Sequence, residues 1–280
     1  MPSVQTEHTC SVLTTIEPHE PAALELRELW ASRELLYFLI WRDIKVRYKQ
    51  TVVGIGWAIL QPLLAMLVLT VVFGNGARLP SEGIPYPLFA YAGLLAWTFF
   101  ANAVFSSSNS LVGHGPLITK IYFPRLLVPL GAVVARLADL AVAFVLMIAL
   151  LTWYHAPFTW RLMMLPLLVF ITMLLALACG LLLSALNVKY RDVNVALPHV
   201  LQFVLFATPV FYSSTILPGG LRWMATLNPL AVLIEGFRAA FFDRPFESGA
   251  LMAAAACAVL LLVFAVAVFR NMEAQFPDLV

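Results

Sequence analysis

Residues 162–186 read LMMLPLLVFITMLLALACGLLLSAL and contain no charged side chain. A helix that crosses the hydrocarbon core of a bilayer needs about 20 apolar residues, so this stretch is long enough to span a membrane. Five further apolar runs flank it, at residues 56–73, 87–105, 127–153, 195–212 and 250–269. The pattern predicts a polytopic membrane protein with six transmembrane helices.

The composition agrees with a membrane protein, because 62% of the 280 residues are hydrophobic and only 11% are charged. Lipid offers the backbone no hydrogen-bonding partner other than itself, and the long runs lack the period of two that strands show, so we predict an all-α fold. The cysteines Cys10, Cys179 and Cys257 are far apart and form no CxxC motif, which argues against a disulfide or a zinc site.

The distribution of cations predicts the topology through the positive-inside rule. If the amino terminus is cytoplasmic, the cytoplasmic cations are Arg27, Arg33, Arg42, Lys45, Arg47, Lys49, Lys120, Arg125, Lys189, Arg191 and Arg270. The outer cations are then only Arg78, Arg161, Arg222, Arg238 and Arg244. We therefore expect both termini in the cytoplasm. We expect no cleavable signal peptide, because the first 25 residues have no apolar core.

The chain divides into four predicted segments. Residues 1–24 form a flexible cytoplasmic tail, residues 25–51 an amphipathic interfacial helix, residues 52–270 the membrane domain and residues 271–280 a cytoplasmic tail. Apolar residues recur at helical spacing in the second segment, with cations on the other face, which is typical of a helix lying in the headgroup layer. The apolar stripe consists of Leu26, Trp30, Tyr37, Ile40, Trp41, Ile44 and Tyr48.

Residues 227–242 are also apolar and form a possible seventh span. The stretch is short, begins with Asn228-Pro229, and carries Glu235 and Arg238 near its middle. Each uncompensated charge at the centre of a membrane helix costs about 2.5–3.5 kcal/mol. We therefore predict a re-entrant extracytoplasmic hairpin between spans 5 and 6 instead.

The third span carries Arg136 and Asp139, which lie on one helix face because they are three residues apart. Ionisable groups inside a membrane usually pair or face water. The spacing predicts an intramembrane ion pair near the cytoplasmic end of the span. A direct role in transport is the alternative.

Catalytic and metal-binding motifs are missing from the sequence. It contains no GxxxxGK[ST] phosphate loop, no GxSxG and no HExxH, and its five histidines are scattered. We therefore expect no metal, no cofactor on this chain and no enzymatic activity, which leaves a passive or externally powered conduit.

Three segments resemble the permease subunits of ABC-2 type exporters, in particular those for O-antigen, capsule and teichoic acid. The first is RDIKVRYKQT at residues 42–51, followed by Gly54 and Trp57. The second is KIYFPR at residues 120–125, with Arg136 and Asp139 beyond it. The third is TPVFYS at residues 208–213, followed by NPL at 228–230 and IEGFR at 234–238.

The resemblance implies a homodimer in the cytoplasmic (inner) membrane, driven by two copies of a separate ATPase that binds ATP and Mg. The substrate would be a lipid-linked polysaccharide, as in lipopolysaccharide biosynthesis, and no nucleic acid is expected as a partner. The implied ATPase-docking residues are Gly113, Pro116, Lys120, Tyr122, Pro124, Arg125, Lys189 and Arg191. The implied residues at the substrate-access surface are Trp41, Arg42, Lys45, Arg47, Tyr48 and Lys49.

The resemblance also implies a tunnel between two protomers, lined mainly by the first and fifth spans, with a gate on the far side. Aromatic rings offer apolar faces to sugar C–H groups. The channel-lining candidates are Trp57, Phe73, Phe203, Phe206, Phe211 and Tyr212. The gate candidates are Pro209, Pro218, Asn228, Pro229, Glu235 and Arg238. A drug or small-lipid exporter and a non-transporting membrane scaffold are the alternative functions.

Overall fold

The computed structural model describes residues 30–49, 56–113, 123–216, 218 and 226–273, and in these ranges every regular element is a helix. The first half contains α2 (Arg33–Lys49), α3 (Gly56–Leu69), a π-helical extension of α3 (Thr70–Gly76), α4 (Tyr86–Gly113), α6 (Leu127–Ala135) and α7 (Leu137–Trp153). The second half contains α8 (Leu165–Lys189), α9 (Asp192–Ala207), α11 (Pro229–Phe241) and α12 (Ser248–Glu273). Short 3-10 turns, Trp160–Met164 and Ser214–Ile216, precede α8 and follow α9.

Five of the described helical segments are long and apolar enough to cross a membrane: Ile59–Gly76, Tyr86–Gly113, Leu127–Trp153, Trp160–Lys189 and Ser248–Glu273. They correspond to the predicted spans 1, 2, 3, 4 and 6. The predicted fifth span is shorter than its apolar run, because α9 ends at Ala207 before Thr208-Pro209, and proline has no N–H for a continuing helix. A six-span fold is therefore not confirmed by helix length.

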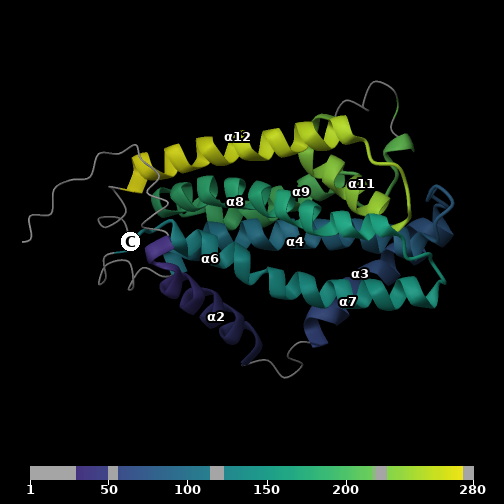
Figure 1. Cartoon of the computed structure of the whole chain (residues 1–280), viewed down its shortest axis with the longest axis horizontal. Coiled ribbons are helices and arrows are strands. Elements are labelled where there is room, and N and C mark those ends of the chain that lie inside the picture. The colour runs from purple at the N-terminus through teal and green to yellow at the C-terminus, as the bar shows by residue number, and fades with distance from the viewer. Residues whose placement is uncertain (1–29, 50–55, 114–122, 217, 219–225, 274–280) are drawn as a thin grey trace, which may run out of the picture.

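The centre of the bundle is α4, which packs on α8, and α8 packs in turn on α12; the three helices run along the long axis of the molecule (Figure 1). Small residues let these helices approach closely, as is common in membranes. A Cβ atom added to Gly180 on α8 would lie 2.5 Å from the Cβ atom of Ser107 on α4. Further along the same contact, the Asn187 amide donates to the Ser108 carbonyl at 3.0 Å.

The third predicted span is interrupted where its charged residues occur. Helix α6 ends at Ala135, Arg136 forms a turn, and α7 begins at Leu137. The Arg136 N–H donates back to the Val133 carbonyl at 3.1 Å instead of continuing regular α-helical bonding. The interruption places the Arg136 side chain between α7, α4 and α2.

Helix α2 crosses the bundle obliquely near the end where α12 finishes (Figure 1). It packs on α6, where Leu39 is buried and a Cβ atom on Gly131 would lie 3.5 Å from the Leu39 Cβ atom. The other large apolar side chains are spread over different faces, since Tyr37, Phe38 and Val46 are all exposed. The apolar stripe predicted from the sequence did not include Leu39, which makes the buried contact. The predicted single apolar face is therefore not confirmed.

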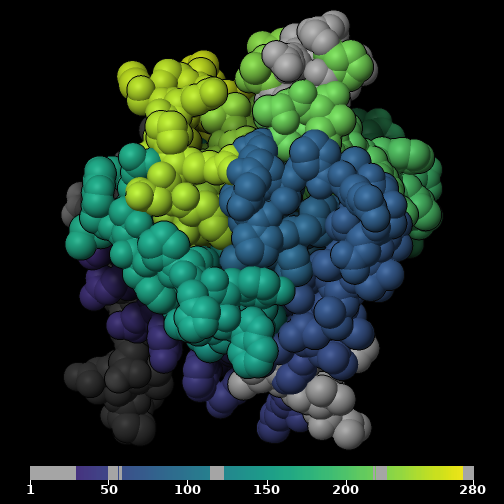
Figure 2. Space-filling model, turned by 90° about the vertical axis from the view of Figure 1, so that its right-hand side faces the viewer, coloured from purple at the N-terminus to yellow at the C-terminus, as the bar shows by residue number. Residues whose placement is uncertain are grey.

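The opposite end of the molecule carries α11 and the beginnings of α4 and α12, and Figure 2 looks onto this end. Helix α11 starts where Asn228-Pro229 predicts a start. The Asn228 side chain accepts a hydrogen bond from the Leu230 N–H at 3.0 Å, and Pro229 occupies the first helical turn.

Candidate functional site

Five charged or polar side chains meet at the interruption between α6 and α7, and they come from α2, α4, α7 and the turn itself. Asp139 accepts hydrogen bonds from Arg47 at 2.7 Å and from Arg136 at 3.1 Å. Its other carboxylate oxygen accepts from the Tyr48 hydroxyl, and Arg136 donates on its far side to Ser106 of α4. The predicted partners Arg136 and Asp139 are thus in contact, within a larger cluster that also includes α2.

The partners from α2 and α4 could not be identified from the sequence. Arg47 and Asp139 are 92 positions apart, and Arg136 and Ser106 are 30 positions apart. The only sequence signal was the presence of two ionisable residues in an apolar span, which require partners. Burial and the hydrogen bond to Asp139 raise the pKa of Tyr48 to about 12, so its hydroxyl remains a hydrogen-bond donor at physiological pH.

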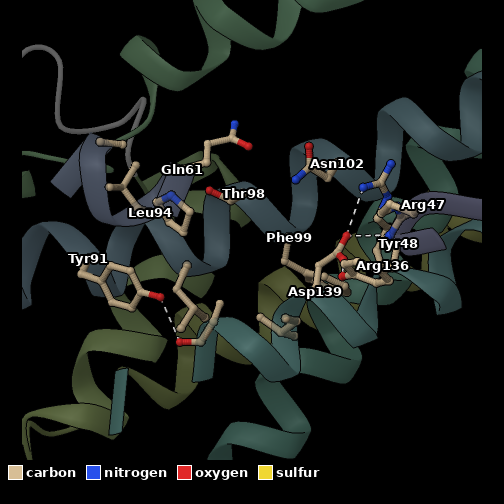
Figure 3. A pocket seen from close by; sticks show the side chains of 15 residues that line it. Arg47, Tyr48, Gln61, Tyr91, Leu94, Thr98, Phe99, Asn102, Arg136 and Asp139 are labelled. Atoms are coloured by element: carbon tan, nitrogen blue, oxygen red, sulfur yellow. Dashed lines mark hydrogen bonds and ion pairs between the residues drawn. The ribbon is translucent and has the colours of Figure 1, made fainter. Parts of the chain in front are cut away.

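A cavity of about 300 Å³ opens beside this cluster, between α2, α3, α4 and α7. Figure 3 shows its charged side chains gathered at one end, with Tyr91 and Leu94 at the other. Gln61, Thr98 and Asn102 contribute neutral polar groups to the wall. The volume lies at the lower end of the range of ligand pockets in proteins.

Most of the predicted access cations do not point into this cavity. Arg42 pairs with its neighbour Asp43 at 2.9 Å, and the Lys45 ammonium lies 4.9 Å from the centre of the Trp41 ring. Lys49 is exposed at the end of α2. Of the access residues, Arg47 and Tyr48 line the cavity.

Four of the predicted channel-lining aromatics form one cluster. Phe73 stacks on Phe211 with ring centres 5.2 Å apart, and Phe206 and Tyr212 meet Phe211 edge-on at 5.7 and 5.4 Å. Phe203 lies apart from the cluster and is 75% exposed on α9. The Trp57 side chain lies outside the described residues. The structure thus brings the end of the first span to the residues that follow α9.

Arg238 of α11 is the largest fully buried side chain among the described residues. Its guanidinium donates to the carbonyl oxygens of Pro209 at 3.0 Å and Val210 at 2.6 Å, and to Glu235 at 2.8 Å. Its face lies 3.7 Å from the ring centre of Phe89 on α4. Three of the predicted gate residues, Pro209, Glu235 and Arg238, therefore form one interaction centre.

The remaining gate candidates lie around this centre. Asn228 donates to the Thr208 hydroxyl at 3.0 Å, and Pro229 follows it in the first turn of α11. Pro218 is exposed, and its neighbours at 217 and 219–225 lie outside the described residues. An outer contact that the sequence did not indicate joins Glu82 to Arg244 and Ser213.

The predicted docking residues fall on both sides of an undescribed stretch. Gly113 ends α4, Pro124 and Arg125 precede α6, and the Arg125 guanidinium donates to the Glu273 carbonyl at 2.5 Å. Lys189 ends α8, and Arg191 lies in the short joint before α9. Pro116, Lys120 and Tyr122 lie outside the described residues. The described docking residues lie near one end of the bundle, because α4, α8 and α12 all end there (Figure 1).

Comparison with known proteins adds independent information. Residues 34–242 match the family model for the ABC-2 type transporter. The O-antigen export system permease protein RfbA of Myxococcus xanthus is 34% identical over 257 residues, which cover 90% of this chain and 98% of the relative. RfbA of Klebsiella pneumoniae is 27% identical, with 88% and 95% covered.

The name of a third relative refers to a different polysaccharide. The polysialic acid transport protein KpsM of Escherichia coli is 24% identical over 84% of this chain and 92% of its own. These relatives are transport proteins, in agreement with the expectation that this chain is not an enzyme. The family match over most of the chain and the apolar helices together show that the chain belongs to the ABC-2 type transporter family, as a multi-pass membrane permease of the kind that exports polysaccharide.

Proposed function

We propose that this chain is the membrane subunit of an ATP-driven exporter that moves a lipid-linked polysaccharide across the cytoplasmic membrane. The observation that carries the proposal is the similarity along almost the full length of the M. xanthus O-antigen permease. The second named substrate among the relatives, polysialic acid, is also a long glycan. The names of these relatives thus point to long glycans, which favours this function over export of a drug or a small lipid.

The working unit in this proposal is a homodimer with the tunnel between its protomers. In a single chain the first span has few contacts with the rest of the protein, since only 6% of its residues between Ile59 and Gly76 are buried. The exposed Phe203 lies on α9, the other helix assigned to the tunnel wall. A second copy that faces α3 and α9 would enclose a path lined by aromatic and small polar groups.

The proposed topology keeps six membrane crossings with both termini in the cytoplasm. Helix α9 has only 16 residues, and the turn held by Arg238 extends it toward the far side. Helix α11 has 13 residues and is too short to cross a bilayer, which supports the re-entrant arrangement. Helix α2 would lie at the cytoplasmic headgroup layer.

Energy would come from a separate ATPase that binds ATP and Mg, because the sequence contains no phosphate loop. The ATPase would dock at the end of the bundle formed by Gly113, Arg125 and the Lys189–Arg191 joint. Coexpression of this chain with a candidate ABC ATPase from the same genome tests the assignment. We expect a stable complex whose ATP hydrolysis requires both chains. Failure of the two chains to copurify, or hydrolysis by this chain alone, would refute the proposal.

A further inference from the structure

Counted over the part of the chain that the structure describes, the cavity beside Asp139 has one more positively charged side chain than negatively charged side chains. Among the described residues that line it, Arg47 and Arg136 are cationic and Asp139 alone is acidic. Asp139 already accepts from both arginines and from Tyr48, so its two oxygens are occupied. One positive charge therefore remains without a partner carboxylate in the wall.

The position of this extra positive charge within the membrane span raises its free-energy cost. Arg136 stands about a third of the way along the 27-residue span Leu127–Trp153, so the cluster lies at membrane depth if that helix crosses the bilayer. The side chains of Arg47, Arg136 and Asp139 are only 25%, 19% and 22% exposed. Partly dehydrated cations at such depth need anionic partners. An anion that enters the cavity would supply the missing charge.

Of the two arginines, Arg47 keeps the larger unused hydrogen-bonding capacity for such an anion within the described residues. The Nε and Nη2 atoms of Arg136 are both engaged by Ser106, and its Nη1 atom by Asp139. Arg47 uses only its Nη1 atom, on Asp139, within the described part of the chain. Its Nε and Nη2 atoms form the fork that binds phosphate oxygens in a bidentate manner.

The rest of the cavity fits an amphiphile rather than a free anion. Apart from the charged cluster, the wall is mostly apolar and includes Ala65, Leu94 and Ala143 from three helices. The neutral side chains of Gln61, Thr98 and Asn102 interrupt the apolar surface. Figure 3 shows this separation, with the arginines at one end and Leu94 and Tyr91 at the other. A headgroup at the arginine end would place an attached hydrocarbon chain along the apolar wall.

We propose that this cavity binds the phosphate or pyrophosphate group of a lipid-linked substrate, with Arg47 as its main ligand. The inference rests on the proposed function, because it assigns the anion to the substrate's lipid carrier. The proposal also reduces the number of α2 cations that would bind the substrate. Arg42 pairs with Asp43 and Lys45 lies against the Trp41 ring, so neither is assigned to the headgroup. The headgroup site would be shared between α2 and the broken third span, rather than lying on α2 alone.

Direct binding to the purified full-length chain in nanodiscs tests the proposal without ATPase, ATP or polymer. The probe is farnesyl pyrophosphate, and the comparison ligands are farnesol, inorganic pyrophosphate and phosphatidylglycerol. We expect farnesyl pyrophosphate to bind at least tenfold more tightly than each of the other three. Binding of farnesol or inorganic pyrophosphate with equal affinity would overturn the amphiphile site. Equal competition by phosphatidylglycerol would reassign the cavity to bulk phospholipid and overturn the substrate assignment.

Variants identify the ligand residue. Arg47→Gln should weaken farnesyl pyrophosphate binding roughly tenfold, the loss of one charge-assisted contact, whereas Arg33→Gln at the other end of the same helix should bind like the wild type. Arg47→Lys should restore part of the affinity. Ala65→Leu, which adds methyl groups to the apolar wall, should weaken binding several-fold without changing any charge. Equal affinities for Arg47→Gln and Arg33→Gln would contradict the assignment, and so would unchanged binding to Ala65→Leu.

The binding result can be separated from the proposed function. If the ATPase complex forms and exports glycan but farnesyl pyrophosphate does not bind, the headgroup site is wrong and the function stands. If the probe binds as described but no polysaccharide is exported, the cavity stands and the transported substrate has been misassigned.

Discussion

The Nη2 atom of Arg238 on α11 lies 2.6 Å from the carbonyl oxygen of Val210, in the turn that follows α9. The same guanidinium contacts Pro209, Glu235 and the face of Phe89, and it is 1% exposed. One side chain thus holds α4, α11 and the end of the α9 turn together. The proposed gate is built around this arginine rather than around the prolines that mark it in the sequence.

Replacement of Arg238 should destabilise the protein strongly. In Arg238→Met, two buried carbonyl groups lose their donor, at about 1–3 kcal/mol for each unsatisfied group, and the partly exposed Glu235 loses its partner. Thermal unfolding in detergent, followed by tryptophan fluorescence, measures the change. The control is Arg161→Gln, whose ion pair with Asp243 is partly exposed and should contribute about 0–1 kcal/mol. Equal shifts for the two variants would show that the contacts of Arg238 are dispensable.

Gly93 on α4 should tolerate no side chain, because Val210 and Arg238 pack against it. A Cβ atom there would overlap the Val210 carbonyl oxygen and lie 2.9 Å from the Arg238 Nη2 atom. Gly93→Ala should therefore lower the unfolding temperature by displacing the α9 turn. Gly249→Ala is the matched control, since no atom lies within 4 Å of the added methyl group. A stable Gly93→Ala protein would mean that the turn is packed differently.

The sequence predicted the helical class, the position of five spans and the spacing of Arg136 and Asp139, because apolar run length and helical periodicity are local properties. It could not predict that Arg47, Tyr48 and Ser106 complete the cluster, since these contacts join residues far apart along the chain. The sequence analysis also assigned Phe203 and Phe211 to the same channel wall. In the structure Phe203 is exposed on α9, whereas Phe211 is buried in the turn after α9 ends at Ala207. Which face of an all-apolar helix is buried depends on packing, and hydrophobicity alone does not encode it.

Arg47 and Asp139 should be energetically coupled across the contact between α2 and α7. A double-mutant cycle with Arg47→Gln, Asp139→Asn and the double variant measures the coupling through the free energy of unfolding. Direct contacts of this kind give about 0.5–3 kcal/mol, and partial exposure places this pair in the lower part of that range. Strict additivity of the two single changes would show that the contact contributes nothing to holding α2 on the bundle.

Phe211 should matter more to stability than Phe203, although both are aromatic residues of the predicted tunnel wall. Phe211→Leu loses ring contacts with Phe73, Phe206 and Tyr212, each worth about 0.5–1.5 kcal/mol. Phe203→Leu removes an exposed ring and should leave the unfolding temperature of the single chain unchanged. The opposite order would contradict the observed cluster.

Charge reversal at the proposed docking end should weaken the complex with the ATPase. Lys189→Glu and Arg191→Glu, made together, place two negative charges in the joint between α8 and α9. We expect loss of copurification in a pull-down at physiological salt, while the permease alone keeps its unfolding temperature. Arg78→Glu, at the opposite end of the first span, is the control and should leave the complex intact. An intact complex with both joint cations reversed would exclude this joint as a docking element.

Deletion of the gene for this chain tests whether the chain exports a lipid-linked polysaccharide. We expect surface polysaccharide to disappear and lipid-linked polymer to accumulate on the cytoplasmic side, and we expect a plasmid copy of the gene to reverse both changes. Undiminished surface polysaccharide, with no intermediate retained inside the deletion strain, would contradict the proposed function.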